Sequence, residues 1–332
     1  MTESFEPVRW GILGTAGIAR DAFLPALAEA GGGTALVVGS RDGEKAAVWA
    51  SANGVAESVK GYAGVLEDPR IEAVYIPLPN GLHAEWTIAA LRAGKTVFCE
   101  KPLCGTPEET AAVLDAARSA PGPLWEAFVF PFHSQTERVR ELLAAGTIGE
   151  LREVRSSFHF LLDDEEDIRM LAELSGGSVQ DVGCYPIRLA RLIFAAEPVA
   201  GRVRADATWS PTGVDEELWG TLAFPGDRRL VVSCGFRSAD DTSTTLLGTT
   251  GRIHLTNPFH PGPGDTITVV RDEHAETEDS PGAHERSFTE TIRHIHRVVR
   301  GLEEPRHLAV DEAMGNAEAI AALLRAARAG AP

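Results

Sequence analysis

The chain carries the stretch Gly11-Ile12-Leu13-Gly14-Thr15-Ala16-Gly17-Ile18-Ala19 between an apolar run, Val8 to Leu13, and a helical pattern, Ile18 to Ala30. A small-residue turn that follows a buried strand and opens a helix is typical of the phosphate-binding fingerprint of dinucleotide domains. Gly14 is expected to make the tight turn, and Ala16 to lie where the backbone nears a pyrophosphate, although Ala16 replaces the usual second glycine. The alternative is a turn that holds no ligand.

Short apolar runs alternate with helical patterns over the first third of the chain. Further strands are expected at residues 35–39, 73–76, 96–99 and 124–128, and further helices at residues 44–53, 84–93 and 107–119. Such alternation indicates βαβ units and a parallel sheet that is covered on both faces. We therefore expect an α/β Rossmann domain over residues 1–125.

After Glu126 the pattern changes to successive strands. We first expect a helix at 135–145, a long strand at 150–160 and a helix near 186–194. Six strands are then expected, at 200–209, 218–224, 230–236, 244–247, 252–255 and 266–270. Helices at 285–300 and 310–327 end the pattern. Strands without intervening helices indicate a large, predominantly antiparallel sheet. We expect an α+β domain over residues 126–332 that binds substrate and forms a homodimer or homotetramer, because the second face of such a sheet needs cover.

Composition favours a small-molecule partner. The formal net charge of −17 opposes binding to nucleic acid or to an anionic membrane. No apolar run approaches the roughly 18 residues of a spanning helix, and Met1 to Pro7 lacks the regions of a signal peptide, so we expect a cytoplasmic protein. The 4 cysteines show no paired spacing and the histidines form no HExxH motif; we expect reduced thiols and no metal site.

The end of the second expected strand indicates which dinucleotide is bound. Ser40 and Arg41 offer a hydroxyl and a guanidinium suited to a 2′-phosphate, which favours NADP(H). Asp42 follows directly and would serve NAD instead if the strand ended later.

A rigid loop follows the strand at residues 73–76. The string Pro77-Leu78-Pro79-Asn80 cannot continue a regular strand, since two prolines fix the backbone and remove donors. Ligands of open α/β sheets bind at this carboxyl edge, so Leu78 and Asn80 are expected to contact cofactor. His83 either contacts the cofactor or has a structural role at the start of the next helix.

Lys101, in Glu100-Lys101-Pro102, follows the next strand at the same edge, and Tyr185 lies downstream as a proton donor. Ketone reduction needs a hydride on carbon and a proton on oxygen, and a phenol with a pKa near 10 donates poorly. A lysine charge about 4 Å away is worth about 4 kcal/mol at a dielectric constant of about 20, equivalent to about three pKa units. Lys101 and Tyr185 are therefore the expected catalytic pair.

Asp181 precedes Tyr185 by four residues, which puts both on one face of a helix. We expect Asp181 to assist catalysis by binding substrate hydroxyls or by orienting Lys101. Its alternative role is that of a helix N-terminal cap.

These motifs, with Gly176-Gly177-Ser178-Val179-Gln180-Asp181-Val182-Gly183-Cys184-Tyr185, together resemble the Gfo/Idh/MocA oxidoreductases over essentially the whole chain. The resemblance implies a Rossmann domain followed by an antiparallel sheet domain, a catalytic or substrate-positioning Lys101 and a cis peptide at Lys101-Pro102. It also implies that Glu100 and Arg169 lie near the cofactor. Many members carry histidine where this chain has Tyr185; the tyrosine resembles the branch of nucleotide-sugar 3-ketoreductases, dimeric dihydrodiol dehydrogenase and glucose-fructose oxidoreductase.

The expected function is that of an NADP(H)-dependent oxidoreductase that acts on a sugar or polyol carbonyl, as a sugar ketoreductase whose substrate could be nucleotide-linked. Dehydrogenation of a free aldose or of a trans-dihydrodiol is an alternative. A dinucleotide-binding sensor without catalysis is an alternative of another class, and retention of Lys101, Asp181 and Tyr185 argues against it.

Overall fold

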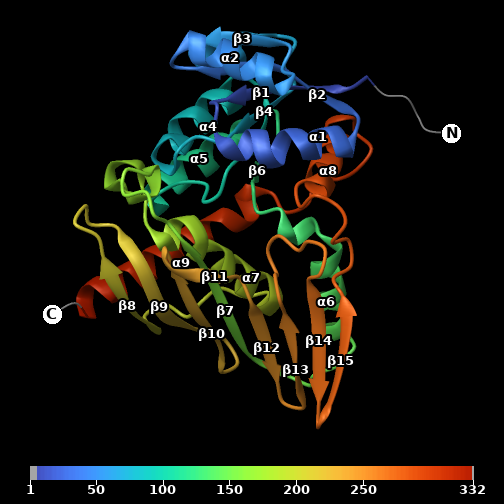
Figure 1. The fold of residues 1–332 in the computed structure, drawn as a ribbon, viewed down its shortest axis with the longest axis vertical. Helices are drawn as coiled ribbons and strands as arrows, with labels where there is room; N and C mark the ends of the chain where they lie inside the picture. The colour runs from blue at the N-terminus through green and yellow to red at the C-terminus, as the bar shows by residue number, and fades with distance from the viewer. Residues whose placement is uncertain (1–5, 331–332) are drawn as a thin grey trace. The chain divides into compact units, whose positions relative to one another are not determined.

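The structure, a computed structural model, describes residues 6–330, and chain contacts divide it into two units (Figure 1). Of the described residues, the first unit contains 6–129 and 286–314, and the second contains 130–285 and 315–330. The domains expected from the sequence were continuous, with a boundary near residue 125. The division found in the structure differs, because residues 286–314 return to the first unit.

The first unit is built on a parallel sheet, as the sequence predicted, and its strand order is β3-β2-β1-β4-β5-β6. Its strands are β1 (Val8–Leu13), β2 (Gly33–Ser40), β3 (Glu57–Lys60), β4 (Ala73–Ile76), β5 (Thr96–Cys99) and β6 (Leu124–Glu126). The sequence did not predict β3. This edge strand has no fully buried residue, so it lacks the apolar pattern that marks the central strands.

Helices cover both faces of this sheet. They are η1 (Ala19–Phe23), α1 (Leu24–Ala30), α2 (Gly43–Asn53), α3 (Ala63–Glu67), η2 (Asn80–Leu82), α4 (His83–Arg92), α5 (Pro107–Ser119), α8 (Thr289–Val299) and the start of α9 (Ala309–Gly330). Aromatic rings fill one side, where Phe23 stacks on Tyr75 with ring centroids 4.1 Å apart. Aliphatic side chains of α3, α4, α5 and α9 fill the other, among them Val65, Leu91 and Ala313.

A buried hydrogen-bond chain explains why α8 belongs to the first unit. Trp10 Nε1 donates to His296 Nε2 at 2.9 Å, and His296 Nδ1 donates to the carbonyl of Gly31 at 2.8 Å. A side chain at Gly33 would collide with the His296 ring. The contact joins residues far apart in sequence, so no local pattern could predict it.

The second unit contains a nine-stranded sheet with the order β15-β14-β13-β12-β7-β10-β9-β8, in which β11 also pairs with β7. The strands are β7 (Leu151–Leu161), β8 (Val203–Trp209), β9 (Asp215–Phe224), β10 (Arg228–Gly235), β11 (Arg237–Asp241), β12 (Thr244–Gly248), β13 (Gly251–Leu255), β14 (Thr266–Arg271) and β15 (His274–Asp279). Only β7 and β10 pair in parallel, which confirms the expected, mainly antiparallel sheet. The sequence did not predict β11 and β15, because both are polar and largely exposed.

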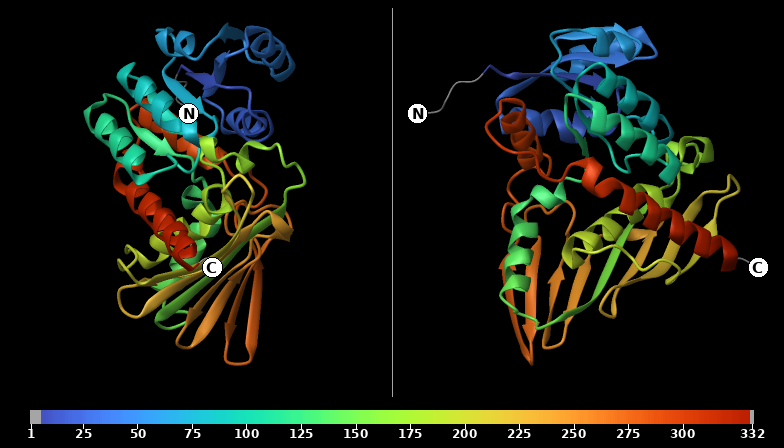
Figure 2. Two further views of the ribbon diagram at one scale, coloured as in Figure 1. Left: turned by 90° about the vertical axis from the view of Figure 1, so that its left-hand side faces the viewer. Right: turned by 180° about the vertical axis from the view of Figure 1, so that it is seen from behind.

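Helical segments cover one face of this second sheet (Figure 2). They include η3 (Phe130–Phe132), α6 (Ser134–Ala144), η4 (Ile168–Met170), η5 (Ala172–Leu174), η6 (Val179–Gly183), α7 (Cys184–Phe194) and the later part of α9. A side chain at Gly220 would meet Leu323 of α9 at 2.6 Å, so the helix packs closely over β9. On the other face Trp219 is 46% exposed.

All four cysteines, Cys99, Cys104, Cys184 and Cys234, are buried and free of disulfides. Burial raises the pKa of the Cys99 and Cys234 thiols, which fits packed, protonated side chains. Within residues 6–330, no helix combines the length and the apolar character that a membrane crossing requires.

Candidate active site

The turn after β1 has the geometry that a dinucleotide cradle needs. Gly14 has a φ of +107°, which favours glycine, and a Cβ there would lie 2.9 Å from Leu78 Cδ2. Thr15 and Ala16 are half-buried, whereas Gly17 and Ile18 are exposed at the start of the helix. The turn therefore leaves backbone N–H groups of a helix N-terminus accessible, the arrangement that binds phosphate.

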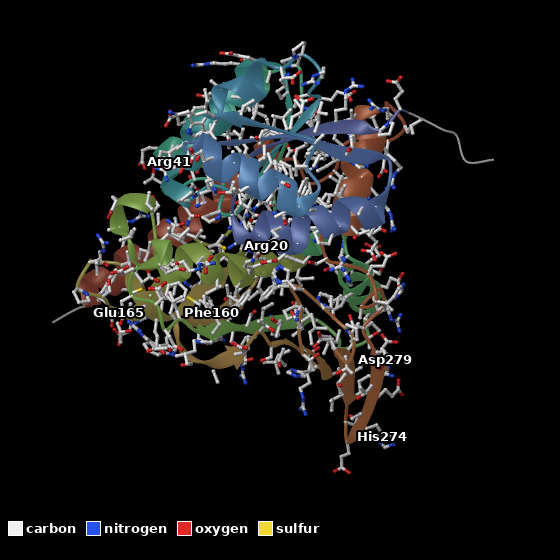
Figure 3. All side chains as sticks on the ribbon, turned by 45° about the horizontal axis from the view of Figure 1, so that its top comes forward. Arg20, Arg41, Phe160, Glu165, His274 and Asp279 are labelled. Carbon is white, nitrogen blue, oxygen red and sulfur yellow. The ribbon has the colours of Figure 1, made fainter. Side chains whose placement is uncertain are left out.

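The end of β2 separates the two candidates for cofactor selection. Asp42 Oδ1 accepts hydrogen bonds from the N–H groups of Glu44 and Lys45 at 2.9 and 3.1 Å, so this carboxylate caps α2. Arg41 is exposed and makes no hydrogen bond or ion pair with the residues that the structure describes (Figure 3). Ser40 ends the strand and is buried. The free guanidinium, rather than the engaged carboxylate, remains available for a ligand.

His83 opens α4 and is fully buried. Its Nδ1 lies 2.9 Å from the carbonyl oxygen of Pro102, and its Nε2 lies 2.7 Å from that of Leu78. Burial lowers the pKa of His83, and a neutral imidazole has a single N–H for these two acceptors. His83 thus connects the loop after β4 to the segment after β5, which is the structural one of the two roles expected for it.

The side chain of Glu100 holds the segment that follows β5. Its carboxylate accepts a hydrogen bond from Tyr75 Oη at 2.6 Å and one from the backbone N–H of Lys101 at 3.2 Å. The Lys101-Pro102 peptide is cis, which confirms the expectation from the family resemblance. Lys101 itself is half-buried, at the edge of the sheet where Asn80 also lies, at the start of η2. Glu100 is buried and holds the backbone N–H of Lys101 through this hydrogen bond.

In the second unit, a buried carboxylate holds the start of the helical segment that leads to Tyr185. Asp215 Oδ2 accepts hydrogen bonds from Ser178 Oγ and from the N–H of Val179, both at 2.7 Å. A side chain at Gly177, where φ is +110°, would collide with the Asp215 carboxylate. Burial raises the pKa of Asp215 to about 6. The hydrogen bonds from Ser178 and Val179 act in the opposite direction and lower this pKa, but burial is the larger influence. No sequence signal marked Asp215, since an isolated aspartate at the start of a strand has many roles.

Tyr185 lies on α7 and is only 5% exposed. Its ring packs against Phe158 and Phe259, with centroids 5.4 and 5.2 Å away. The phenol Oη lies 3.4 Å from Nε2 of His260, a long hydrogen bond. His260 was missed from the sequence; the signal that could have found it is the rigid, proline-flanked string Pro258-Phe259-His260-Pro261.

Asp181 pairs with Arg169, which the family resemblance places near the cofactor. Arg169 Nε donates to Asp181 Oδ2 at 2.7 Å, and Arg169 Nη1 donates to Asp167 at 3.1 Å. The two carboxylates raise the pKa of Arg169, with Asp181 as the larger influence. Asp181 lies within the π-helical turn η6, which has Ser178 at its N-cap, so its alternative role as a helix cap is not what the structure shows. The sequence analysis made both residues candidates for the site, but it did not predict that they would pair with each other.

Two family matches cover most of the chain. Residues 8–128 match a family described as an oxidoreductase family with an NAD-binding Rossmann fold, and residues 136–254 match a Gfo/Idh/MocA C-terminal domain. The chain belongs to the Gfo/Idh/MocA oxidoreductases. The resemblance noted in the sequence is thereby confirmed, as are the Rossmann domain and the mainly antiparallel sheet.

Named relatives within the Gfo/Idh/MocA oxidoreductases span nearly the whole chain. D-xylose 1-dehydrogenase (NADP(+)) 2 of Haloferax volcanii is 36% identical over 97% of this chain and 98% of its own length. The dTDP-3,4-didehydro-2,6-dideoxy-alpha-D-glucose 3-reductase of Streptomyces violaceoruber is 38% identical over 88% of this chain and 87% of its own. The crystal structure of KijD10, a 3-ketoreductase from Actinomadura kijaniata in complex with NADP and TDP-benzene, superposes with a TM-score of 0.87 at 32% identity over 98% of both chains.

Proposed function

We propose that the protein is an NADP(H)-dependent oxidoreductase that reduces a ketone on a sugar, with a nucleotide-linked deoxysugar as the favoured substrate class. The observation that carries the proposal is the similarity to the NADP-bound 3-ketoreductase over 98% of both chains. A reductase of a dTDP-linked deoxysugar is also a relative. The fold alone would leave the reaction open, because Rossmann domains serve many activities.

The residues of the first unit fit a bound NADP(H). The positive φ of Gly14 and the exposed helix start at Gly17 and Ile18 suit the pyrophosphate. The exposed guanidinium of Arg41 suits the 2′-phosphate. We assign Thr15, Ala16, Ser40, Leu78 and Asn80 to the same cofactor site, and Glu100 to holding the backbone of Lys101. The cofactor supplies the hydride when it is bound.

Lys101 and Tyr185 are the proposed catalytic pair. Tyr185 donates the proton to the carbonyl oxygen, and Lys101 stabilises the negative charge that develops on that oxygen and on the phenolate. Asp181 binds sugar hydroxyls or orients Lys101, and Arg169 holds the Asp181 carboxylate in place through the 2.7 Å hydrogen bond.

Substitution tests this pair. Lys101→Met and Tyr185→Phe should each lower kcat by about 100-fold or more with NADPH and a dTDP-linked 3-keto sugar, because each removes a charge or proton needed in the transition state. Tyr62→Phe is the matched control, since Tyr62 packs on Trp86 in the first unit. Full turnover by both catalytic variants would refute the mechanism.

Oxidation of a free aldose is the second candidate, and the D-xylose 1-dehydrogenase relative favours it. The same residues would act in reverse, with Tyr185 as the base. Assays of D-xylose with NADP⁺ and of dTDP-linked keto sugars with NADPH separate the two candidates by their kcat/KM. The kcat/KM for a trans-dihydrodiol with NADP⁺ should be measured in the same comparison. If none of these substrates changes the absorbance of the cofactor, the non-catalytic sensor becomes the better reading.

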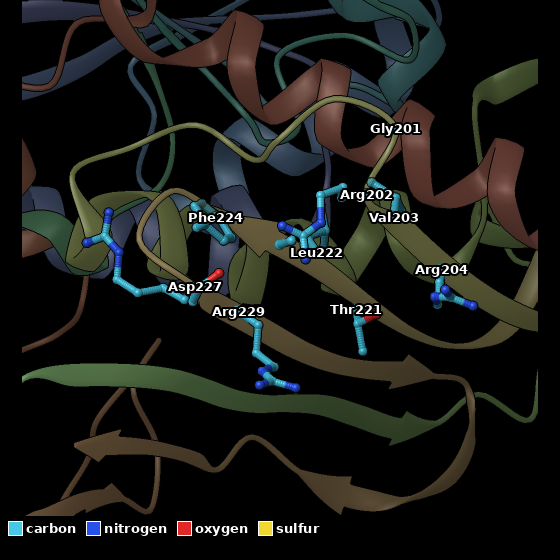
Figure 4. Close-up of a pocket in the computed structure, with 11 residues that line it drawn as sticks. Gly201, Arg202, Val203, Arg204, Thr221, Leu222, Phe224, Asp227 and Arg229 are labelled. Atoms are coloured by element: carbon cyan, nitrogen blue, oxygen red, sulfur yellow. The ribbon is translucent and has the colours of Figure 1, made fainter. Parts of the chain in front are cut away.

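The open face of the second sheet is the proposed interface of a homodimer or homotetramer. Trp219 is exposed on it, and a hollow of about 680 Å³ beside Trp219 is also lined by Val231 and Thr221. A neighbouring hollow of about 510 Å³ is lined by Arg204, Thr221 and Arg229, which point away from α9 (Figure 4). Trp219→Glu should yield a smaller species in sedimentation, whereas a monomeric wild type would refute the interface.

A cytoplasmic location, expected from the sequence, completes the proposal. The four buried cysteines form no disulfide, which fits a reducing compartment. Fractionation of cells that express the tagged chain tests it, and recovery in an exported fraction would contradict it.

A further inference from the structure

The loop that carries His260 is held in a defined conformation. Asn257 Oδ1 accepts hydrogen bonds from the N–H groups of Phe259 and His260 at 3.3 and 3.0 Å, and its Nδ2 donates to the carbonyl of His260 at 2.8 Å. One amide side chain thus closes the turn from both directions, as asparagine does in tight turns. The imidazole is presented from a fixed backbone.

A second set of hydrogen bonds anchors this turn to the rest of the unit. Gln135 Nε2 donates to the carbonyl of Asn257 at 2.9 Å, and Gln135 Oε1 accepts from Ser280 Oγ at 2.7 Å. Gln135 is only 1% exposed, so this connection between α6, the His260 loop and the end of β15 is buried. Polar groups in such a buried network are satisfied only in one arrangement, which restricts where His260 can lie.

The loop places His260 beside the phenol of Tyr185. The two rings are 5.2 Å apart at 69°, and Nε2 lies 3.4 Å from Oη. Phe259 stacks on Phe158 at 5.5 Å, and both also pack on Tyr185. Of the rings that pack on the phenol, the imidazole is the one that can accept or donate a proton.

The two side chains differ in their access to water. Tyr185 is 5% exposed, whereas His260 is half-buried. A buried phenol that gives up a proton in every turnover must regain it, and a partly exposed imidazole in contact with it supplies a route.

We propose that His260 is the proton partner of Tyr185, an inference that rests on the proposed function. In ketone reduction the Tyr185 O–H bond breaks as the proton passes to the carbonyl oxygen, and the hydride adds at carbon. The phenolate then takes the proton from Nε2 of the protonated imidazolium of His260, so an N–H bond breaks, an O–H bond forms and the ring is left neutral. The imidazole regains its proton from water. In the oxidative direction each transfer runs in reverse. His260 acts through Tyr185 and is therefore a positioning and proton-relay residue.

Two substitutions separate proton transfer from packing. His260→Phe keeps an aromatic ring on Tyr185 and removes the nitrogens, and His260→Ala opens space for added imidazole. We expect both variants to bind NADPH and to melt like wild type, with kcat lowered by about 10- to 100-fold, KM little changed and a displaced pH profile of kcat. Imidazole should restore part of the kcat of His260→Ala and leave His260→Phe unchanged.

His254 offers a matched control. It lies on β13, six positions earlier in the chain, is half-buried and contacts Thr245 at 3.0 Å. His254→Ala should keep the wild-type kcat and show no response to imidazole. Wild-type turnover by His260→Phe would overturn the proposal, as would loss of kcat in His260→Ala with no imidazole rescue and an unchanged pH profile.

A titration without substrate tests the contact independently. The chain has 3 tyrosines, so the phenolate absorbance of Tyr185 is obtained by subtracting the curve of Tyr185→Phe. We expect His260→Phe to move the midpoint of the Tyr185 titration, and an unmoved midpoint would overturn the inference. If instead the wild type turned over no carbonyl or alcohol while the midpoint moved, the proposed function would fail and the contact would stand.

Discussion

Ser178 Oγ donates a hydrogen bond of 2.7 Å to Asp215 Oδ2, and this bond ties strand β9 to the helical segment on which Tyr185 lies. Asp215 Oδ2 also accepts a hydrogen bond from the backbone N–H of Val179, at 2.7 Å. A carboxylate at a helix start satisfies backbone donors that would otherwise have no partner. The position of the proposed proton donor therefore depends on a residue 30 positions later in the sequence.

Removal of this carboxylate should destabilise the second unit and lower turnover. Asp215→Ala leaves two buried donors unsatisfied, at a cost of about 1–3 kcal/mol each. We expect a lower Tm and a reduced kcat, while Asp215→Asn, which keeps an acceptor oxygen, recovers much of both. Calorimetry and steady-state kinetics measure these effects. Equal Tm values for Asp215→Ala and wild type would show that the hydrogen bonds contribute nothing.

The same residue gives a pH dependence of stability. Burial raises the pKa of Asp215 from 3.8 to about 6 in the folded protein, so the folded state binds this proton more tightly than the unfolded state. The contribution to stability is full below about pH 4 and is lost as the pH rises through about 6, by up to about 3 kcal/mol. Asp215→Asn cannot titrate there. Denaturant unfolding at several pH values should therefore show wild type losing stability relative to Asp215→Asn across this window.

His296 should produce the opposite trend in the first unit. Its Nε2 accepts from Trp10, and burial lowers the pKa of His296 from 6.5 to about 4. Its contribution to stability is full above about pH 6.5 and is lost as the pH falls through about 4, by up to about 3 kcal/mol. His296→Gln should show a flatter dependence of the unfolding free energy on pH between these values. An identical slope in both proteins would contradict the assignment of a neutral, buried imidazole.

Cofactor preference should depend on Arg41 and not on Asp42. Arg41→Ala removes the exposed guanidinium, and we expect the Kd of NADPH to rise about 10-fold or more while that of NADH changes little. Asp42→Asn keeps an oxygen that can cap α2 and should leave the preference unchanged. Fluorescence titration measures both constants. An unchanged ratio in Arg41→Ala would remove the 2′-phosphate assignment.

The turn after β1 should not tolerate a side chain. Gly14→Ala would place a methyl group 2.9 Å from Leu78 Cδ2 at a φ of +107°, a strain of about 1–3 kcal/mol. We expect the affinity for NADPH to fall by about 10-fold or more. Gly64→Ala, which meets Val59 at an ordinary 3.5 Å, is the control and should bind NADPH normally.

The local pattern of the sequence determined the Rossmann sheet and the mainly antiparallel second sheet. It also gave the positions of the candidate site residues in both domains. Strands with buried apolar runs, such as Val8–Leu13, were predictable because burial imposes a repeating pattern on neighbouring residues. Edge strands such as β15 were not, because exposed residues carry no such pattern. Lys101, Asp181 and Tyr185 could be proposed as candidates because their motifs have a fixed spacing.

Tertiary structure alone decided which groups contact these candidates. Asp215 reaches Ser178, His260 reaches Tyr185 and His296 reaches Trp10 across long sequence separations, and only packing brings such residues together. The structure also turned Asp42 into a helix cap and enclosed His83 between two carbonyls. A sequence fixes the chemistry that a side chain can perform, whereas its partners and its burial, which set its pKa and its role, depend on the folded chain.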